Sequence, residues 1–225
     1  MNGFLNDISL KIIDKKVKVG FTAGIASLFI LTLTKGGYLH PSDIFMYIEI
    51  ILPCIFAITA IFIFKDDCTE EIHNMVMIYN KKKYNKVLLI RILRFLGISL
   101  IIFLGLTVVS VFASKNAEYH IFKEGVKLDL SVIGLFIRSY SNTIFLSMLP
   151  LFILKVSKNI FVAGGFCTFY IFQEIGSEGT YTNPVNLFVS YSQRSVYTQE
   201  VFLLNRLFFI VLSVIFIAYI VKKKN

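Results

Sequence analysis

The sequence predicts an all-α, polytopic membrane protein with a single transmembrane domain over residues 1–225, and two observations carry this prediction. First, 56% of the residues are hydrophobic and the mean hydropathy is +0.73, which is more apolar surface than one soluble core of this size could bury. Second, apolar stretches of about 18 to 20 residues, enough to cross about 30 Å of hydrocarbon, recur along the chain. We therefore expect lipid to surround most of it.

Six apolar stretches are candidates to cross the membrane, with their ends placed at the nearest charged residues. The first and fifth are the shortest. The N-terminal residues carry charges among their apolar positions and no small-residue cleavage site follows promptly, unlike a removable signal peptide, so we expect the first span to remain. The expected spans are 19–34, 44–64, 92–113, 132–154, 159–176 and 203–221.

The distribution of lysine and arginine predicts the orientation of the spans. Sixteen of the 23 lie before the first span, between the second and third, between the fourth and fifth, or after the sixth. Six lie on the opposite side, and Arg138 falls inside the fourth span. Since cytoplasmic connections carry the excess of positive charge, we expect both termini in the cytoplasm.

The net charge of +9 does not indicate a nucleic-acid partner. The basic residues stand at the ends of the spans, where they would meet anionic lipid head groups. We therefore expect membrane lipid around the chain and no nucleic acid. Cys54, Cys68 and Cys167 predict neither a disulfide framework nor a metal cluster.

No catalytic or nucleotide-binding pattern stands out in the sequence. There is no G-x-x-x-x-G-K-[ST] loop to hold nucleotide phosphates. His40, His73 and His120 do not stand at metal-ligand spacings. We therefore expect a protein that is not an enzyme and that binds neither a metal nor a cofactor directly.

Two segments outside the spans have patterns of their own. Residues 1–18 place Leu5, Ile8 and Ile12 near helical spacing with lysines opposite, which predicts a helix in the membrane interface; a disordered basic leader is the alternative. Residues 177–202 contain NPVNLFVSY, a semi-apolar run opened by Asn-Pro and too short to span. This run predicts a re-entrant helical element in the outer leaflet.

The cytoplasmic segment 65–91 predicts an amphipathic helix from about Asp67 to Asn80. Asp67 can cap this helix and Glu70 completes a capping box, and acidic residues there suit the positive end of the helix dipole. Apolar residues follow at i, i+3, i+4 and i+7 and form a face that a partner should cover. The residues expected to bind that partner are Asp67, Glu70, Glu71, Ile72, Met75, Val76 and Tyr79.

Two ionisable residues, Glu49 and Arg138, lie well inside the predicted spans. A charge at mid-depth costs roughly 2.5 to 3.5 kcal/mol on insertion scales, so each needs a partner or water. A direct contact between Glu49 and Arg138 is one interpretation. The other is that Arg138 reaches outward to the interface while Glu49 is neutral or hydrogen-bonded between helices.

Small residues form faces on the first and fifth spans that would allow helices to approach closely. Such faces serve either a dimer interface or packing within the chain, and the pattern does not separate the two. The residues expected at a dimer interface are Gly20, Gly24, Ser27, Gly164 and Thr168.

Six spans, a cytoplasmic amphipathic helix after the second and a re-entrant element before the sixth together resemble the ABC-2 type permeases, the transmembrane subunits of ABC exporters. The run KDDCTEEIHNMVMIYNKKKYNKVLLIRI resembles the coupling-helix segment of that family. It has an acidic helix start, apolar positions, a short break and a basic cluster before the third span. The break is commonly Pro- or Ser-rich in relatives, whereas here it is YNKKKYNK.

This resemblance implies a permease subunit that moves a hydrophobic or amphipathic substrate, a peptide or a lipid-like molecule. It implies a separate ABC ATPase subunit that uses ATP and Mg²⁺, and a second permease chain in a homodimer or heterodimer. The Ile-, Lys- and Asn-rich composition looks like that of a low-GC bacterium, in whose cell membrane small permeases of this kind often export antimicrobial or toxin peptides or protect against them.

Two other classes of protein stay open. One is the substrate-binding membrane subunit of a vitamin uptake system, which also has about six spans but contacts its ATPases through another subunit. That class would lack a long amphipathic helix after the second span. The other is a membrane protein that transports nothing, such as an immunity or scaffold protein.

Overall fold

The computed structural model describes residues 19–20, 22–33, 41–68, 81–112, 122–123, 126–127, 132–176, 187 and 199–222. Nearly all of these residues are helical, which confirms the all-α prediction. A two-residue antiparallel ribbon, with Phe122 opposite Lys127, accompanies the helices. The elements are a first helix (Thr22–Leu33), α2 (Pro41–Met46), η1 (Tyr47–Ile51), α3 (Leu52–Cys68), α5 (Lys81–Phe112), β1 (Phe122–Lys123), β2 (Val126–Lys127), α6 (Val132–Ser157), α7 (Ile160–Gly176) and α8 (Gln199–Lys222).

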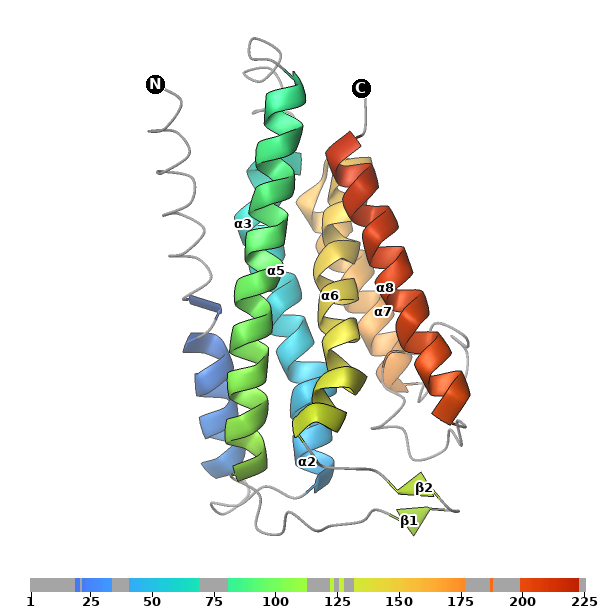
Figure 1. The fold of residues 1–225 in the computed structure, drawn as a ribbon. Coiled ribbons are helices and arrows are strands. Elements are labelled where there is room, and N and C mark those ends of the chain that lie inside the picture. The colour runs from blue at the N-terminus through green and yellow to red at the C-terminus, as the bar shows by residue number, and fades with distance from the viewer. Residues whose placement is uncertain are drawn as a thin grey trace.

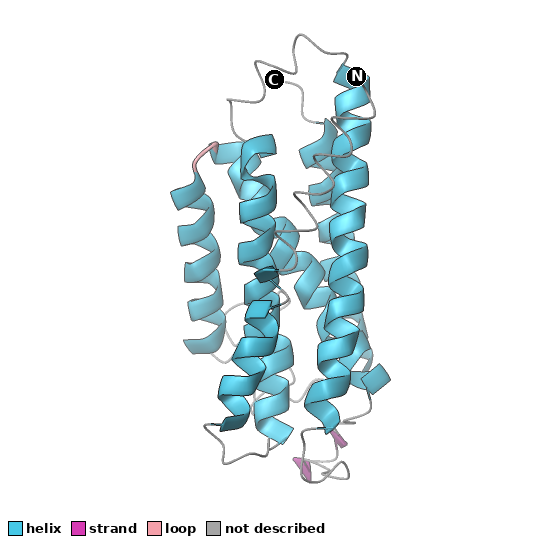
Figure 2. Cartoon of the chain, turned by 90° about the vertical axis from the view of Figure 1, so that its left-hand side faces the viewer, coloured by secondary structure: helices cyan, strands magenta, loops and turns pink. Residues whose placement is uncertain are grey.

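The long helices lie side by side, roughly parallel to one direction, and successive helices run up and down in turn (Figures 1 and 2). α3, α6 and α8 end at the upper end of Figure 1, where α5 and α7 begin, and we call this the upper end. α2, α6 and α8 begin at the opposite, lower end, where α5 ends. A chain that crosses an apolar layer repeatedly requires this alternation.

Four helices are long and apolar enough to cross a membrane, judged by length and composition: Tyr47–Cys68, Tyr84–Phe112, Val132–Ser157 and Leu203–Lys222. They correspond to the predicted second, third, fourth and sixth spans. The predicted first and fifth spans coincide with shorter apolar helices, Thr22–Leu33 and Ile160–Gly176. Six crossings therefore stay a prediction, whereas a helical protein with several membrane-length helices is what the structure describes.

Two helices extend beyond their predicted ends at the upper end. α3 continues to Cys68 rather than ending at residue 64, and α5 begins at Lys81 rather than at residue 92. Neither extension contains a proline or glycine that would stop a helix. Most of the expected amphipathic helix, residues 69–80, lies outside the described part of the chain.

Two other expected segments also fall largely outside the described residues. The N-terminal segment 1–18 lies outside them entirely. Of the expected re-entrant segment 177–202, the structure describes only Leu187 and the start of α8.

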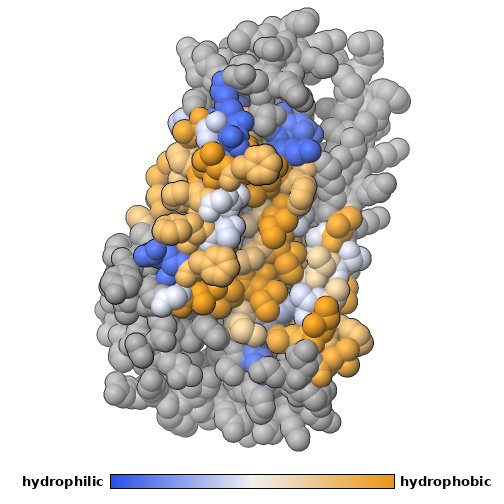
Figure 3. Space-filling view, turned by 180° about the vertical axis from the view of Figure 1, so that it is seen from behind, coloured by the Kyte–Doolittle hydropathy of each residue, from blue (hydrophilic) through white to orange (hydrophobic). Residues whose placement is uncertain are grey.

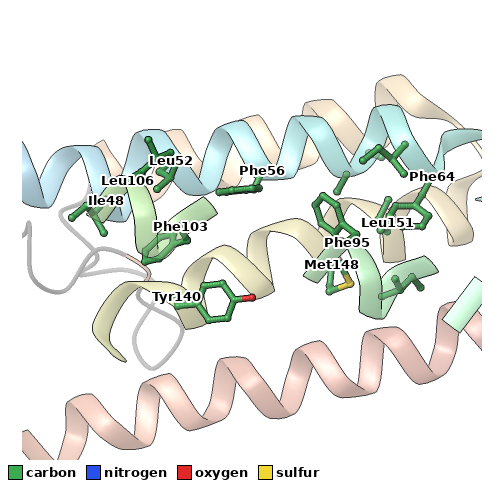
Figure 4. Close-up of a cluster of buried hydrophobic side chains, with 14 of the residues drawn as sticks. Ile48, Leu52, Phe56, Phe64, Phe95, Phe103, Leu106, Tyr140, Met148 and Leu151 are labelled. Atoms are coloured by element: carbon green, nitrogen blue, oxygen red, sulfur yellow. The ribbon is translucent and has the colours of Figure 1, made fainter. Parts of the chain in front are cut away.

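α6 is the central helix of the bundle and contacts α3, α5, α7 and α8. On one side, side chains of η1, α3, α5 and α6 point toward one another (Figure 4). There, Tyr140 of α6 meets Phe103 of α5 at 5.5 Å between ring centroids and donates a hydrogen bond to the Leu96 carbonyl oxygen. On the other side, Phe145 of α6 meets Phe209 of α8 at 4.6 Å. Aromatic packing therefore binds α6 to its neighbours on both faces.

A π-helical turn, η1, precedes α3 and carries Glu49. The N–H of Leu52 donates to the carbonyl oxygen of Tyr47, which is five residues earlier. In an α-helix the acceptor would be four residues earlier. Pro53 follows and has no N–H to donate to the carbonyl of Glu49, so the regular α-helical pattern could not continue here. Such single π turns occur frequently at functional sites.

The turn between α6 and α7 is tight and is capped on both sides (Figure 2). Lys158 has a positive φ of 55°, the left-handed conformation that often ends a helix, and its N–H bonds to the Leu154 carbonyl oxygen. Asn159 caps α7, because its Oδ1 accepts from the N–H of Phe161 at 2.8 Å. α6 and α7 are therefore neighbours in an antiparallel pair.

Gly20, just before the first helix, and Gly24, within it, are packed against other helices of the same chain. A Cβ atom added at Gly20 would lie 2.6 Å from Thr59 Oγ1 of α3, and one added at Gly24 would lie 2.9 Å from Leu106 Cδ1 of α5. Tyr47 Oη also donates to the carbonyl oxygen of Gly24. For these two glycines, the intrachain alternative describes the contacts that the structure shows.

On the face of the bundle seen in Figure 3, most of the described side chains are apolar. Phe161, Phe169 and Phe172 of α7 and Leu204 and Leu207 of α8 are more than half exposed. Apolar side chains in such numbers are excessive for a surface in contact with water but suit one in contact with lipid.

We predict that Gly20→Ala and Gly24→Ala each destabilise the protein by about 1–3 kcal/mol, because the added methyl group overpacks the contact with α3 or α5. Gly105→Ala is the matched control, since nothing lies within 4 Å of a Cβ atom there. Thermal unfolding of the purified protein in detergent measures the difference. Equal melting temperatures for the three variants would contradict the packing described.

Candidate functional site

Three charged side chains lie between the helices with almost no exposed surface. Glu49 of η1 and Glu174 of α7 are fully buried, and Arg206 of α8 is 3% exposed. Removing a charge from water is costly, so buried charges are found beside opposite charges or hydrogen-bonding groups. All three have such neighbours, which belong to one connected cluster.

Arg206 is the centre of this cluster. Its Nη2 lies 3.8 Å from Glu49 Oε1, and both side chains are buried. Its Nη1 donates to Asn142 Oδ1 of α6 and to the carbonyl oxygen of Leu187, the latter at 3.1 Å. The guanidinium fork thus connects η1, α6 and α8 with a residue from the connection between α7 and α8.

Side chains form hydrogen bonds with both polar groups of the Leu187 backbone, its N–H and its carbonyl oxygen. Its N–H donates to Glu174 Oε2 at 2.8 Å. Its carbonyl oxygen accepts from Arg206 and also from Asn142 Nδ2. In an apolar interior these backbone groups need partners, and here side chains rather than a helix or sheet supply them. We refer to Glu49, Asn142, Glu174, Leu187 and Arg206 as the Leu187 cluster.

The Leu187 cluster lies toward the lower end of the bundle. Arg206 stands seven residues after the start of α8, about 10 Å along the helix at 1.5 Å per residue. Glu174 stands at the end of α7, which stops at Gly176, short of the lower ends of α6 and α8 (Figure 1). The shortness of α7 leaves room for Leu187 to enter between the helices.

A second buried polar group connects α3 and α5 at the upper end. Asp67 Oδ1 lies 2.7 Å from Arg91 Nη1, with side chains 4% and 15% exposed. Tyr84 Oη donates to Asp67 Oδ1 at 3.3 Å, and the Arg91 guanidinium lies over the ring of Phe64 at 5.7 Å. We refer to Asp67, Tyr84 and Arg91 as the α3–α5 clamp.

The predicted coupling residues are only partly within the described chain. Asp67, expected to cap a new helix, lies instead in the last turn of α3 and binds Arg91 of α5. The remaining six, Glu70, Glu71, Ile72, Met75, Val76 and Tyr79, lie outside the described residues.

Of the two intramembrane residues singled out from the sequence, Glu49 is buried as expected of a residue between helices. The structure gives it a charged neighbour in Arg206, from α8, and a contact with Arg138 stays a prediction. Arg138 belongs to α6, and its side chain is outside the described part of the structure.

The predicted dimer residues divide into two groups. Gly20 and Gly24 contact α3 and α5 of their own chain, and Ser27 Oγ donates to the Gly24 carbonyl oxygen. At Gly164 of α7 nothing lies within 4 Å of an added Cβ atom, and Thr168 is exposed on the same helix. A dimer interface stays a prediction; on α7, Thr168 is exposed and Gly164 is half-buried with open space at its Cβ position.

Sequence reasoning missed most of the Leu187 cluster. Glu174 lies inside the predicted fifth span and Arg206, one of the six basic residues assigned to the outer side, inside the predicted sixth, but neither was singled out from the sequence. Both are ionisable residues inside apolar helices, which is the same signal that identified Glu49 and could have found them. The role of Leu187 leaves no signal in the sequence, because its contacts are made by the backbone.

The fold and this buried polar site define a class: a helical protein with several apolar helices of membrane-spanning length, joined in their interior by a charged cluster. Comparison with protein-family models, with curated proteins and with solved structures finds no significant match to this chain. Function must therefore be argued from the geometry of the chain itself.

We predict that Arg206→Met strongly destabilises the protein, by about 3–5 kcal/mol, because it leaves buried carboxylates without their guanidinium. Adding Glu49→Gln to Arg206→Met should recover part of the loss, since one of those charges is then removed. Lys222→Met, at the exposed end of α8, is the control. Thermal unfolding in detergent provides the comparison, and a double variant no more stable than Arg206→Met alone would argue against the Glu49–Arg206 pair.

Proposed function

We propose that this chain is the transmembrane permease subunit of an ATP-driven exporter of the ABC-2 type, in a bacterial cell membrane. In this proposal a separate ATPase subunit hydrolyses ATP and docks on the connection between α3 and α5. The permease moves a hydrophobic or amphipathic substrate, and two permease chains act together. The termini and the α3–α5 connection lie in the cytoplasm.

The observation that carries this proposal is the α3–α5 clamp. A docking segment can move the spans only when its two ends are attached firmly to them. Asp67 is the penultimate residue of α3, and Arg91 and Tyr84 belong to the first part of α5, so their contacts join the two ends of segment 69–80. Because these contacts are buried, the low local dielectric strengthens them.

In the proposed mechanism, closure of the ATPase subunits pushes on segment 69–80. The clamp transmits the displacement to α3 and α5 together, rather than letting the connection bend alone. α3 packs heavily on the central helix α6, which contacts α7 and α8 in turn. A push at the upper end would therefore tilt several spans as a unit.

Two further features support the proposal. The outward surface of the described helices is apolar and suits lipid and a hydrophobic passenger. The small residues Gly164 and Thr168 leave room beside α7, so a second permease chain could approach this helix closely.

We predict that Met75→Glu combined with Tyr79→Glu abolishes co-purification of ATPase activity with the affinity-tagged chain, because the charges disrupt the apolar face that the ATPase covers. Tyr119→Glu, in the connection between α5 and α6, is the matched control and should leave co-purification unchanged. ATP photo-crosslinking of the purified complex identifies the ATPase subunit.

The same experiment separates the alternatives. Binding that survives both charge substitutions would remove segment 69–80 from the coupling role. Dependence on a third membrane subunit would favour a vitamin uptake system, and a chain that purifies with no ATPase at all would favour an immunity or scaffold protein.

We predict that a single cysteine at Tyr119 is labelled by a membrane-impermeant maleimide in intact cells, whereas one at Tyr79 is labelled only after lysis. The cysteines at positions 54, 68 and 167 are first replaced by serine or alanine. The reverse labelling pattern would overturn the proposed orientation.

A further inference from the structure

Leu187 is fully buried and belongs to an apolar cluster whose other members come from four helices; we call the place that its side chain fills the apolar pocket. Leucine supplies the apolar surface, and its burial in such a pocket is favourable. The connection that carries Leu187 is otherwise outside the described residues, so this residue is its described point of contact with the bundle. The other buried members of this cluster are Ala57 of α3, Phe145, Leu146 and Leu149 of α6, Cys167 of α7 and Phe209 of α8.

The polar atoms around Leu187 match both polar groups of a single peptide residue. A carboxylate, Glu174, accepts from the N–H, while a carboxamide and a guanidinium, Asn142 and Arg206, donate to the carbonyl oxygen. None of these contacts depends on the identity of the neighbouring residues in the chain. They would hold any residue that offers an apolar side chain, a free N–H and a carbonyl oxygen.

The donors and acceptors are oriented by contacts of their own. Arg206 also contacts Glu49 and Asn142, so its guanidinium has partners on η1 and α6 besides the carbonyl oxygen of Leu187. Sites whose groups are oriented in advance bind with a smaller entropic cost. This arrangement is that of a recognition site for peptide backbone, placed next to a pocket for one apolar side chain.

We propose that the Leu187 cluster and its apolar pocket form a binding site for an apolar residue of a separate peptide, and that the chain's own Leu187 occupies this site at rest. The identification of that peptide as exported cargo rests on the proposed function, but binding itself requires no ATPase. A tethered occupant acts at an effective concentration on the order of mM. A separate peptide must therefore displace it.

The test uses the full-length protein in lipid nanodiscs and a fluorescent peptide with the sequence NPVNLFVSY, which is that of residues 183–191. Leu187→Asp places a charge that the apolar pocket excludes, and so frees the site. The labelled peptide should bind Leu187→Asp at least tenfold more tightly than the unaltered protein. Fluorescence anisotropy measures both affinities, with empty nanodiscs to subtract partitioning into lipid.

Two changes then examine the polar contacts. The same peptide with N-methyl-leucine at its central leucine cannot donate to Glu174 and should bind at least tenfold more weakly. Asn142→Leu, introduced into Leu187→Asp, should weaken binding similarly because it removes a donor to the carbonyl oxygen. The N-methyl peptide needs no second protein variant, so the comparison stands even where Asn142→Leu does not fold.

The proposal is overturned when Leu187→Asp binds the peptide no more tightly than the unaltered protein, or when N-methylation has no effect. If palmitate displaces the labelled peptide, and the unmodified and N-methylated peptides bind with equal affinity, the pocket would be assigned to lipid instead. Peptide binding that is sensitive to N-methylation, in a chain that never co-purifies with an ATPase, would support this site while refuting the proposed exporter. Co-purification with an ATPase, in a chain whose peptide binding is insensitive to N-methylation, would support the proposed exporter while refuting this site.

Discussion

The interior of a bilayer offers no water to charges or to backbone groups, so these groups need partners within the protein. At the lower end of this molecule, Arg206 is the central partner. Its guanidinium lies near Glu49 and bonds to Asn142 and to the carbonyl oxygen of Leu187. η1, α6, α8 and the connection after α7 therefore depend on one cation. The entry of Leu187 between the helices depends on such partners, because side chains bond to both its N–H and its carbonyl oxygen.

The upper end is joined by a second polar group, and one helical stretch connects the two. α2, η1 and α3 follow one another without interruption from Pro41 to Cys68, with Glu49 near one end and Asp67 at the other. Between them the contacts are apolar and aromatic, as where Phe64 meets Phe95 at 5.8 Å. The π turn at Glu49 is the irregular place in this stretch, and π turns are common where function requires a local adjustment.

In the proposed exporter, the ATPase subunit would dock near one end of the continuous helical stretch α2–η1–α3, and the cargo would bind near its other end. A displacement at Asp67 would reach Glu49 through α3, and Glu49 lies next to the guanidinium that holds Leu187. Coupling of this kind requires an element with two arrangements rather than mere proximity. The exchange of Leu187 for a cargo residue would provide those two arrangements.

The sequence by itself determined the helical class and the approximate positions of the long spans, because the length and apolarity of a crossing helix are local properties. It also singled out Glu49, since an ionisable residue in an apolar run is conspicuous. The partners of Glu49 and Asp67 were decided only by the tertiary structure, because Arg206 and Arg91 lie far away in the chain and no spacing rule relates them. The contacts of Gly20 and Gly24 were decided in the same way, since small residues suit a neighbouring helix of either the same chain or another. Leu187 is the clearest case, because its role depends on backbone atoms that every residue possesses and on three helices that bring their side chains to it.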